Sequence, residues 1–482
     1  MKIKSIKLNA ILNVIKQLCA IIFPLVTIPY VTRILHATNY GKVNFSSSII
    51  SYFSLIAQLG IVSYAIREGA KLRDDKRKIE QFSNEVFSIN LITTIIAYIL
   101  LGLAILISSK LQDYYLLLII QSTVIIFTTL GADWVNNIYE DFLYITIRSI
   151  AVQAISLILM FVLVHDEDDY IVYAVVTVCA QIGVNILNVF YIRKYLHIKP
   201  TIHLRIKNHI KPILYLFFNN VAMTIYINSD ITMLGFMVND AAVGIYNIAT
   251  KIYMVIKHII NAIVTVTLPR LSAYVENEDK RPYHNLLERV FESIITVLFP
   301  AITGLLILSK PIILLLSDIE YIQAVKVLQI LSISLIFAVF GGFFTICILV
   351  PNRMDKALLI ATSIAAGINI ILNIFLIPLW SYNGAAITTA IAELFVLIIT
   401  RHYAKKIYDI KCSLRTIISV LIGCFIILFI CISINYLFQS NLVIVTLSVL
   451  LSCLAYGLIM YWLKNPLVCG VVNNLINKMK KY

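Results

Sequence analysis

Residues 9–32 read NAILNVIKQLCAIIFPLVTIPYVT, an apolar run with a single charged side chain, Lys16. A helix needs ~20 such residues to cross the hydrocarbon core of a bilayer. Similar runs continue to residue 463, and 60% of the residues are hydrophobic against 13% charged. We therefore expect an all-α membrane protein with about fourteen transmembrane helices. The expected spans are residues 9–32, 44–66, 82–107, 114–135, 144–164, 170–191, 212–236, 243–267, 290–316, 324–349, 357–379, 385–404, 415–437 and 441–462.

Lys and Arg fall almost entirely in alternate connections between these spans. With the amino terminus in the cytoplasm, the cytoplasmic side holds 31 of the 39 basic residues, whereas the other side has an acidic run at residues 166–169. This asymmetry obeys the positive-inside rule. It predicts a multi-pass protein of the bacterial plasma (inner) membrane with both termini cytoplasmic. The net charge of +14 then reflects topology, and we expect no nucleic-acid partner. The basic residues of the opposite side are Arg33, Lys42, Lys110, Lys310 and Lys326.

The connections are too short to hold a catalytic domain; the longest are residues 193–211 and 270–289. The chain has no G-x-S-x-G, P-loop or H-E-x-x-H motif, and its eight cysteines show no metal-binding spacing. We therefore expect no enzyme, no metal and no cofactor, but movement of a solute across the bilayer. A membrane glycosyltransferase or polysaccharide polymerase is a distant alternative, for which the acidic run would have to be more than a solvated turn.

A short internal repeat divides the chain into two halves. Residues 41–44 (GKVN) recur as residues 244–247 (GIYN), and both copies follow a span that is entered from the cytoplasm. Parallel six-helix halves with a substrate site between them are a known transporter architecture. We expect pseudo-symmetric six-helix halves and two additional C-terminal helices with a cytoplasmic tail. The corresponding domains are residues 1–211, 212–406 and 407–482.

Polar side chains form stripes on several of the expected helices. On the second span, one helix face carries Asn44, Ser48, Ser51 and Gln58. The eighth span carries a corresponding stripe of Asn247, Lys251, His258 and Asn261. Shifting by 203 residues superposes Asn44 on Asn247 and Gln58 on Asn261. Similar stripes include Gln181 on the sixth span and Asn220, Thr224 and Asn228 on the seventh. These stripes predict a polar cavity, although hydrogen bonds between neighbouring helices, worth ~0.6 kcal/mol each, would produce the same pattern.

Charged residues within the spans are stronger candidates than the amides. A Lys or Asp at mid-bilayer costs ~2.5–3.5 kcal/mol on insertion scales, so such residues persist where they pair or line water. Lys251 and Asp230 rank first, and Lys16, Lys257 and Glu393 follow. Lys16 lies close enough to the cytoplasmic end for its ammonium group to reach the membrane surface.

Several segments together resemble a known family. Phe23-Pro24, residues 28–35 (IPYVTRIL) and Tyr40-Gly41 are similar to the first-span signature of the Wzx-type oligosaccharide flippases, with His36 where a glycine commonly follows. These flippases belong to the multidrug/oligosaccharidyl-lipid/polysaccharide (MOP) exporter superfamily. The resemblance covers essentially the whole chain. Later landmarks are Asp133-Trp134 and residues 226–235, 244–246 and 268–271.

The resemblance implies a MOP/MATE-like fold and a function. Members translocate an undecaprenyl-diphosphate-linked oligosaccharide repeat unit from the cytoplasmic to the outer leaflet for surface polysaccharide synthesis. The two halves would provide alternating access, coupled to an ion gradient. The implied partners are the lipid-linked oligosaccharide, membrane lipids and proteins of polysaccharide synthesis and polymerisation.

With such a cargo, the candidate residues take specific roles. Lys251, with Arg33 at the outer mouth and Lys16 at the inner, would attract the diphosphate. Asp230 or Glu393 would carry a coupling proton. The remaining cavity candidates, which would hydrogen-bond the sugar hydroxyls or line the cavity beside them, are Asn44, Asn220, Asn247, Asn261 and His258.

Two other transporters of the same fold remain open as alternatives. A MATE-like exporter of organic cations should have an acidic or aromatic cavity, and a flippase of lipid-linked peptidoglycan precursor an arginine-rich one. The deep bases Lys16, Lys251 and Lys257 outnumber the acids Asp230 and Glu393. This count favours an anionic, lipid-linked cargo.

Overall fold

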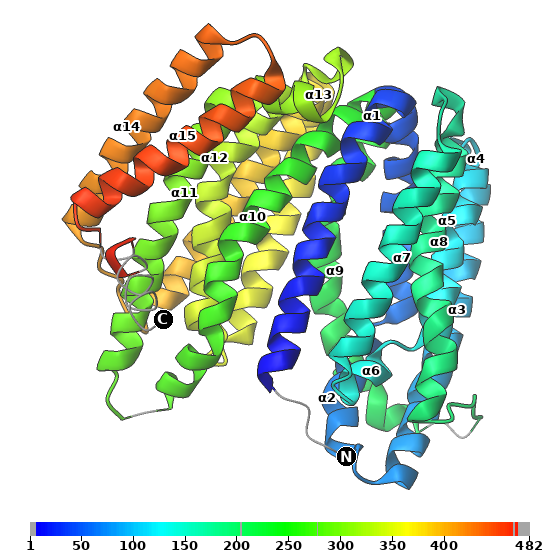
Figure 1. Cartoon of the computed structure of the whole chain (residues 1–482). Coiled ribbons are helices and arrows are strands. Elements are labelled where there is room, and N and C mark those ends of the chain that lie inside the picture. The colour runs from blue at the N-terminus through cyan, green and yellow to red at the C-terminus, as the bar shows by residue number, and fades with distance from the viewer. Residues whose placement is uncertain (1–5, 203–204, 277, 466–467, 471–482) are drawn as a thin grey trace. The chain divides into compact units, whose positions relative to one another are not determined.

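The computed structural model describes residues 6–202, 205–276, 278–465 and 468–470, and all regular structure in these ranges is helical (Figure 1). The expected all-α fold is confirmed. The longer helices are α1 (Ile6–Gln58), α2 (Ile61–Leu72), α3 (Lys76–Ile107), α5 (Tyr115–Gly131), α7 (Phe142–Leu163), α8 (Tyr170–Tyr191), α9 (Ile206–Met237), α10 (Asp240–Val275), α11 (Arg281–Leu316), α12 (Ala324–Phe343), α13 (Asp355–Lys405), α14 (Leu414–Leu437) and α15 (Asn441–Trp462).

Short elements connect these helices: α4 (Ser109–Gln112), α6 (Trp134–Ile138), the 3₁₀ turns η1 (Glu167–Asp169), η2 (Ile192–Lys194) and η3 (Ile319–Tyr321), and the π-helical turn η4 (Phe344–Leu349). Within the described ranges, 11 helices are long and apolar enough to cross a membrane, and α5 is a shorter apolar helix. The chain is thus a multi-pass membrane protein.

Two of the helices are longer than a bilayer requires, and each is broken in its middle. Helix α1 has 53 residues, which would extend about 80 Å if it were straight. His36 interrupts it with φ 56° and ψ 177°, and Ser381 interrupts α13 with φ 50° and ψ −132°. Figure 1 shows the chain turning back at the upper end of α1. Each broken helix therefore carries two of the expected spans, while the total of about fourteen stays a prediction.

The chain packs as two compact units, unit 1 (Met1–Gly244) and unit 2 (Ile245–Tyr482). In unit 1, α1 contacts α3, α5, α7 and α9, and α8 packs on α5 and α7. Helix α9, placed in the second half by the sequence repeat, packs on α1 and α2 of unit 1. A packing unit and a sequence repeat are different divisions, so the predicted domain boundaries stay a prediction.

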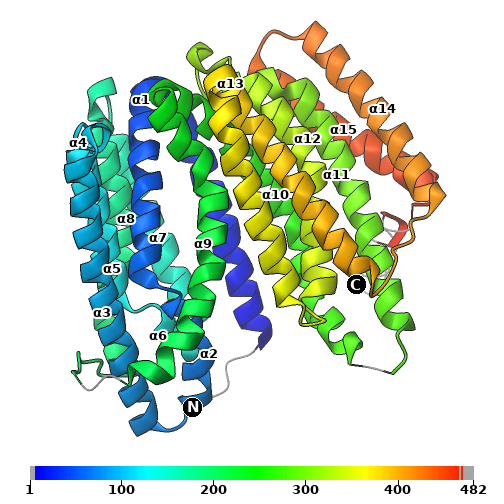
Figure 2. The same cartoon turned by 180° about the vertical axis from the view of Figure 1, so that it is seen from behind.

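Unit 2 is built around α11, which contacts α12, α14 and α15, while α12 also packs on α13. Figure 2 shows α14 and α15 lying obliquely across this unit. Leu308 of α11 joins Ile427 of α14 and Ile444 of α15 in one buried cluster. The outward side of α14 is apolar, since Phe425 is 70% exposed and Phe429 67%, as expected for a surface that meets lipid.

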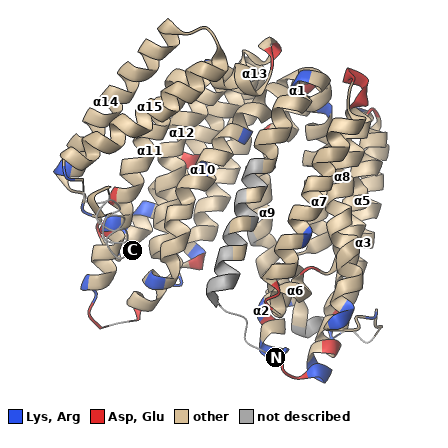
Figure 3. Ribbon diagram, viewed as in Figure 1, with Lys and Arg blue, Asp and Glu red and all other residues tan. Residues whose placement is uncertain are grey.

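Charges in unit 1 separate along the helix axes. Lys and Arg concentrate at the end that holds α2 and α6, and the acidic turn between α7 and α8 lies at the opposite end (Figure 3). A buried apolar cluster that includes Ile61, Tyr64, Phe82 and Trp134 closes the basic end. These positions agree with the charge pattern used above to assign the cytoplasmic side.

Close backbone contact holds α1 against the start of α10 within unit 1. A Cβ on Gly41 would lie 1.8 Å from the Asp240 carbonyl oxygen and 3.1 Å from the Gly244 nitrogen. A Cβ on Gly244 would lie 2.2 Å from the Ala37 carbonyl oxygen. The glycines that begin the two repeated tetrapeptides therefore pack directly on each other. Side chains of any size would separate these segments.

We predict that Gly41→Ala lowers the thermal stability of the purified protein. The added methyl group must displace the backbone of Asp240, and overpacking of this kind costs about 1–3 kcal/mol. The matched control is Gly102→Ala, because nothing lies within 4 Å of its Cβ position. Differential scanning fluorimetry in detergent should show a lower melting temperature for the first variant only. Equal melting temperatures would contradict the close contact.

A second prediction concerns the break in α1. His36 occupies a backbone region that is almost restricted to glycine and costs about 1–3 kcal/mol for other residues. His36→Gly should stabilise the protein by about 1 kcal/mol after the extra unfolded-state entropy of glycine is subtracted. Thr38→Gly, two residues on and helical, should instead destabilise it. Thermal unfolding of both variants checks the sign, and destabilisation by His36→Gly would refute the strain.

Candidate functional site

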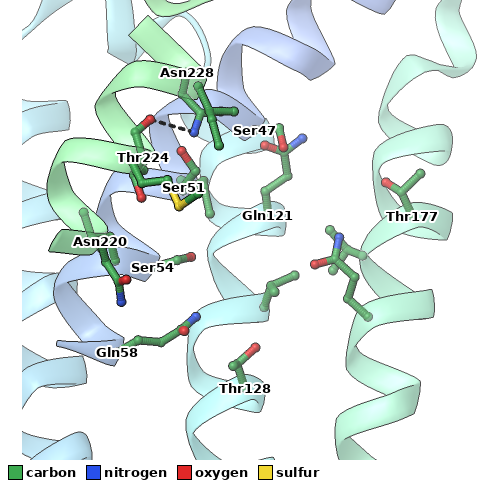
Figure 4. Close-up of a pocket in the computed structure, with 17 residues that line it drawn as sticks. Ser47, Ser51, Ser54, Gln58, Gln121, Thr128, Thr177, Asn220, Thr224 and Asn228 are labelled. Atoms are coloured by element: carbon green, nitrogen blue, oxygen red, sulfur yellow. Dashed lines mark hydrogen bonds between the residues drawn. The ribbon is translucent and has the colours of Figure 1, made fainter. Parts of the chain in front are cut away.

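A polar cavity of about 510 Å³ lies inside unit 1 (Figure 4). It is bordered by the second half of α1 and by α5, α8 and α9. Eleven of the 17 lining residues are Ser, Thr, Asn or Gln, and none of the 17 is charged. The polar members are Ser47, Ser51, Ser54, Gln58, Gln121, Thr128, Thr177, Gln181, Asn220, Thr224 and Asn228.

Helical periodicity explains how these side chains meet. The four polar residues of α1 follow each other at four, seven and eleven positions from Ser47, which keeps them on one face. Thr177 and Gln181 are one turn apart on α8, and Asn220, Thr224 and Asn228 follow the same rule on α9. Each helix therefore contributes one stripe, and the stripes converge because the helices pack around a common space.

Several amides in the cavity have no hydrogen-bond partner in the part of the chain that the structure describes. Among the described residues, the side chains of Gln58, Gln181 and Asn220 make no hydrogen bond. Gln121 donates to the Val43 carbonyl at 3.1 Å, but its own Oε1 is buried without a donor. Asn228 donates to the Thr224 carbonyl of its own helix at 3.1 Å, as drawn in Figure 4.

Each free amide offers two donors and a carbonyl acceptor. A ligand rich in hydroxyl groups can use both. Apolar side chains such as Ile50, Val124 and Met223 line the same space and suit the non-polar faces of a sugar ring. The cavity is therefore chemically suited to a neutral polyhydroxylated ligand, and it has no fixed charge to hold an isolated ion.

The structure brings part of the predicted stripes into this cavity. Asn220 lines it, together with Ser51, Gln58 and Gln181. Asn44 is not among the lining residues, and its Nδ2 donates to the Tyr40 carbonyl at 2.7 Å within α1. Arg33 is exposed near the break in α1, and the side chain of Lys16 falls outside the described part of the structure.

Other residues of the lining were not predicted from the sequence. Five hydroxyl and amide residues were not singled out, because an isolated Ser or Thr in an apolar helix usually bonds its own backbone. Thr177 does so at 2.8 Å to the Ala174 carbonyl. On α5, Gln121 and Thr128 are seven residues apart and so share one helix face, which could have indicated a polar stripe from the sequence. The missed residues are Ser47, Ser54, Gln121, Thr128 and Thr177.

The remaining amide and basic candidates lie on α10 in unit 2. Asn247 is buried, whereas Lys251 and His258 are exposed. Lys251 has no ion pair within the part of the chain that the structure describes. The Oδ1 of Asn261 is buried and accepts no hydrogen bond from the described residues.

The two acidic candidates occupy different units and different surroundings. Asp230 is buried in α9 of unit 1. In unit 2, Glu393 of α13 pairs with Lys257 of α10, with Nζ and Oε1 2.6 Å apart, and accepts a 3.1 Å hydrogen bond from the Tyr253 hydroxyl. Lys257, counted above among the deep bases, is thus neutralised by a buried carboxylate. The excess of deep bases over acids therefore rests on Lys16 and Lys251.

Two further buried polar groups anchor the basic end of unit 1. His209 lies between Glu85 and Tyr64, with its Nε2 2.8 Å from a Glu85 carboxylate oxygen and its Nδ1 2.7 Å from the Tyr64 hydroxyl. Arg148 of α7 is also buried. Its Nη2 donates at 2.7 Å to Asp133, the first residue of the Asp133-Trp134 landmark. The His209 contacts tie α2, α3 and α9 together, and the Arg148 contact ties α7 to the residue before α6. All of these residues lie outside the cavity lining.

Comparison with known proteins agrees with this architecture. The chain is 23% identical over 397 residues to the "Putative O-antigen transporter" of Escherichia coli K12, covering 81% of this chain and 95% of that protein. Its fold is similar to that of the lipid II flippase MurJ in an inward closed conformation, with a TM-score of 0.77, 18% identity, and 95% and 100% of the two chains covered. An inward-facing multidrug resistance MATE family transporter of the MOP superfamily matches with a TM-score of 0.54, 14% identity, and 80% and 97% coverage.

The family assignment follows from sequence. Residues 6–275, more than half of the chain, match the model of the family described as polysaccharide biosynthesis protein. The resemblance found from the first-span residues is therefore confirmed, and the likeness to MurJ and the MATE transporter shows the fold that was expected. The chain belongs to the polysaccharide biosynthesis protein family and has the fold of the MOP exporter superfamily.

Proposed function

We propose that this protein is a flippase for undecaprenyl-diphosphate-linked oligosaccharide repeat units. It carries them from the cytoplasmic to the outer leaflet of the bacterial plasma membrane by alternating access, with both termini in the cytoplasm. The observation that carries the proposal is the uncharged polar cavity of unit 1, which lies among membrane-spanning helices and holds three amides that bond no described residue.

The physical argument starts from the cost of moving sugars through hydrocarbon. Each hydroxyl that loses water without a new partner costs several kcal/mol in an apolar medium, roughly 4–8 on water-to-cyclohexane scales. A cavity lined by amides and hydroxyls replaces that water. The polyprenyl tail has no such need and can stay in the bilayer. A lipid-linked glycan therefore needs a polar cavity of this kind beside the lipid.

The family and its relatives support the same conclusion. The Escherichia coli relative is named an O-antigen transporter, and MurJ is named a lipid II flippase. Both names describe movement of a polysaccharide or its lipid-linked precursor, and neither describes catalysis. We infer that the substrate and membrane lipids are the partners, together with proteins of polysaccharide synthesis and polymerisation.

In this proposal the glycan and the diphosphate use different residues. Gln58, Gln181 and Asn220 bind the sugars, because their amides are free. Lys251 attracts the diphosphate, since it is exposed and forms no ion pair with the described residues. Arg33 at the outer mouth of the transport path and Lys16 at the inner mouth are further candidates for attracting the diphosphate. Asn44, Asn247, Asn261 and His258 remain secondary candidates. Of these, Asn44 would first have to release the Tyr40 carbonyl.

The alternatives are less well supported by the cavity. An exporter of organic cations needs an acid or an aromatic surface to hold its cargo, and the 17 residues around the unit 1 cavity include no acidic or aromatic side chain. A flippase of peptidoglycan precursor would share the sugar chemistry, but the same lining contains no arginine.

Replacing two free amides by apolar groups of similar size should reduce transport. We predict that Gln58→Leu with Gln181→Leu lowers the flipping rate at least about tenfold, because unmade hydrogen bonds to buried hydroxyls cost ~1–3 kcal/mol each. The measurement is restoration of surface polysaccharide in a bacterium that lacks its own flippase, at matched protein levels. The control is Gln153→Leu on α7, which is also a glutamine in a span but does not line the cavity.

The possible results distinguish a sugar-binding site from a role in folding and from a MATE-like exporter. Full transport by the double variant would refute the assigned sugar site. Equal loss in the Gln153→Leu control would show that any polar residue in unit 1 is needed for folding. Failure of the wild-type chain to restore polysaccharide, together with increased resistance to cationic dyes, would favour the MATE-like exporter.

Ion coupling is tested at the buried pair of unit 2. Removing Lys257 alone leaves Glu393 as an uncompensated buried charge, which costs about 3–5 kcal/mol, whereas removing both partners is close to neutral. We predict that Lys257→Met with Glu393→Gln folds normally but loses transport driven by an ion gradient, while Tyr253→Phe retains it. Gradient-driven transport at the wild-type rate in the double variant would exclude Glu393 as the coupling group and leave Asp230 as the candidate.

A further inference from the structure

A second pocket, of about 320 Å³, lies in unit 2 at the end of α13 that carries Arg401 and Lys405. We propose that it binds the head group and upper acyl chain of an anionic phospholipid from the cytoplasmic leaflet. The inference is independent of the transport function proposed above. It rests on an apolar floor, a basic rim and a wall that is fixed before any ligand arrives.

The floor consists of aromatic rings from three elements. Phe291 of α11 packs against Phe340 of α12, with ring centroids 5.1 Å apart, and against Phe344 at the start of η4 at 6.5 Å. Phe344 is buried, and Leu397 of α13 lines the same space. The π-helical turn that begins at Phe344 is a rare geometry that occurs often at functional sites. The floor can receive hydrocarbon without rearrangement.

The rim carries positive charge. Arg401 and Lys405 are one helical turn apart and both exposed. Arg401 has no ion pair among the described residues, while Lys405 contacts Asp409 at 3.6 Å with both side chains about two-thirds exposed. Asp409 also lines the pocket, so its lining holds two bases and one acid and its net charge stays positive. A guanidinium fork beside an ammonium group is suited to the oxygens of a phosphate.

The wall of the pocket is the segment between α13 and α14, and α11 holds it in place. The Tyr408 hydroxyl donates to Glu288 at 2.5 Å, and the His284 ring stacks on Tyr408 with centroids 3.9 Å apart. The Ser413 amide donates to Glu292 at 3.0 Å. The hydrogen bond to Glu288 raises the pKa of Tyr408 to about 12, so its hydroxyl remains a donor at neutral pH. The pocket is therefore preformed.

The position of the pocket identifies its occupant. Arg401 and Lys405 belong to the connections that the charge rule assigns to the cytoplasm, and Ile398, one turn earlier on α13, is 52% exposed. The basic rim thus follows directly on uncovered apolar surface, as at the boundary between acyl chains and head groups. Basic pockets between membrane helices on this side bind anionic head groups. The pocket is also smaller than the polar cavity of unit 1, which favours a glycerophosphate over a glycan.

Lipid binding by the full-length protein tests the proposal. The purified chain in a neutral detergent is titrated with dioctanoyl phosphatidylglycerol, and adducts are counted by native mass spectrometry. We expect one phosphatidylglycerol that dioctanoyl phosphatidylcholine does not replace, and at least about tenfold weaker binding in Arg401→Ala with Lys405→Ala, equivalent to ~1.4 kcal/mol. The control, Lys356→Ala with Lys406→Ala, removes two exposed charges that do not line the pocket.

Two further measurements separate head-group attraction from binding in the pocket. Leu397→Trp keeps both charges but fills the space, and it should also weaken phosphatidylglycerol binding at least about tenfold. Inorganic phosphate at millimolar concentration should fail to displace the lipid, because it lacks the acyl chain. Unchanged binding in the Arg401/Lys405 variant, equal loss in the Lys356/Lys406 control, or full displacement by phosphate would each overturn the proposal.

Discussion

The hydrocarbon interior of the membrane is the constraint on which the rest of this structure depends. It offers no water, so every backbone amide and carbonyl in a span must be paired within the protein. Helices satisfy this requirement locally, and all regular structure in the described residues is helical. The same constraint makes polar side chains costly inside the spans. Where such side chains collect, as in the cavity of unit 1, they indicate function more strongly than they would in a water-soluble protein.

Close packing of backbones is the second consequence of this environment. Helices in a membrane gain little from burying apolar side chains, because lipid is equally apolar, and they associate through small residues and close contact. Gly41 and Gly244 bring α1 against the first turn of α10 in this way. The break at His36 lets α1 turn within five residues of that contact. Together they set how the second half of α1 presents Ser51 and Gln58 to the cavity.

Charged side chains occupy different places in the structure from the residues that line the polar cavity. The 17 residues that line the cavity of unit 1 include none, so a ligand held there is recognised by hydrogen bonds and apolar contacts, without an ion pair. The ion pair of Lys257 and Glu393 is buried in unit 2, where it joins α10 to α13. Lys251 and Arg401, which form no ion pair with any described residue, are exposed instead. This separation is consistent with a cargo that has a neutral glycan and an anionic head group.

The sequence by itself determined the helices, their approximate bounds and the family, because spans and the first-span signature are local patterns of hydrophobicity and residue type. It also identified Asn220, Gln58 and Gln181 as polar-stripe residues. Only the tertiary structure decided which stripes share a cavity, that Asn44 bonds its own helix, and that Lys257 is neutralised by Glu393 from a helix 136 residues away. Helical period fixes the face on which a side chain lies, but the packing of neighbouring helices decides what that face meets.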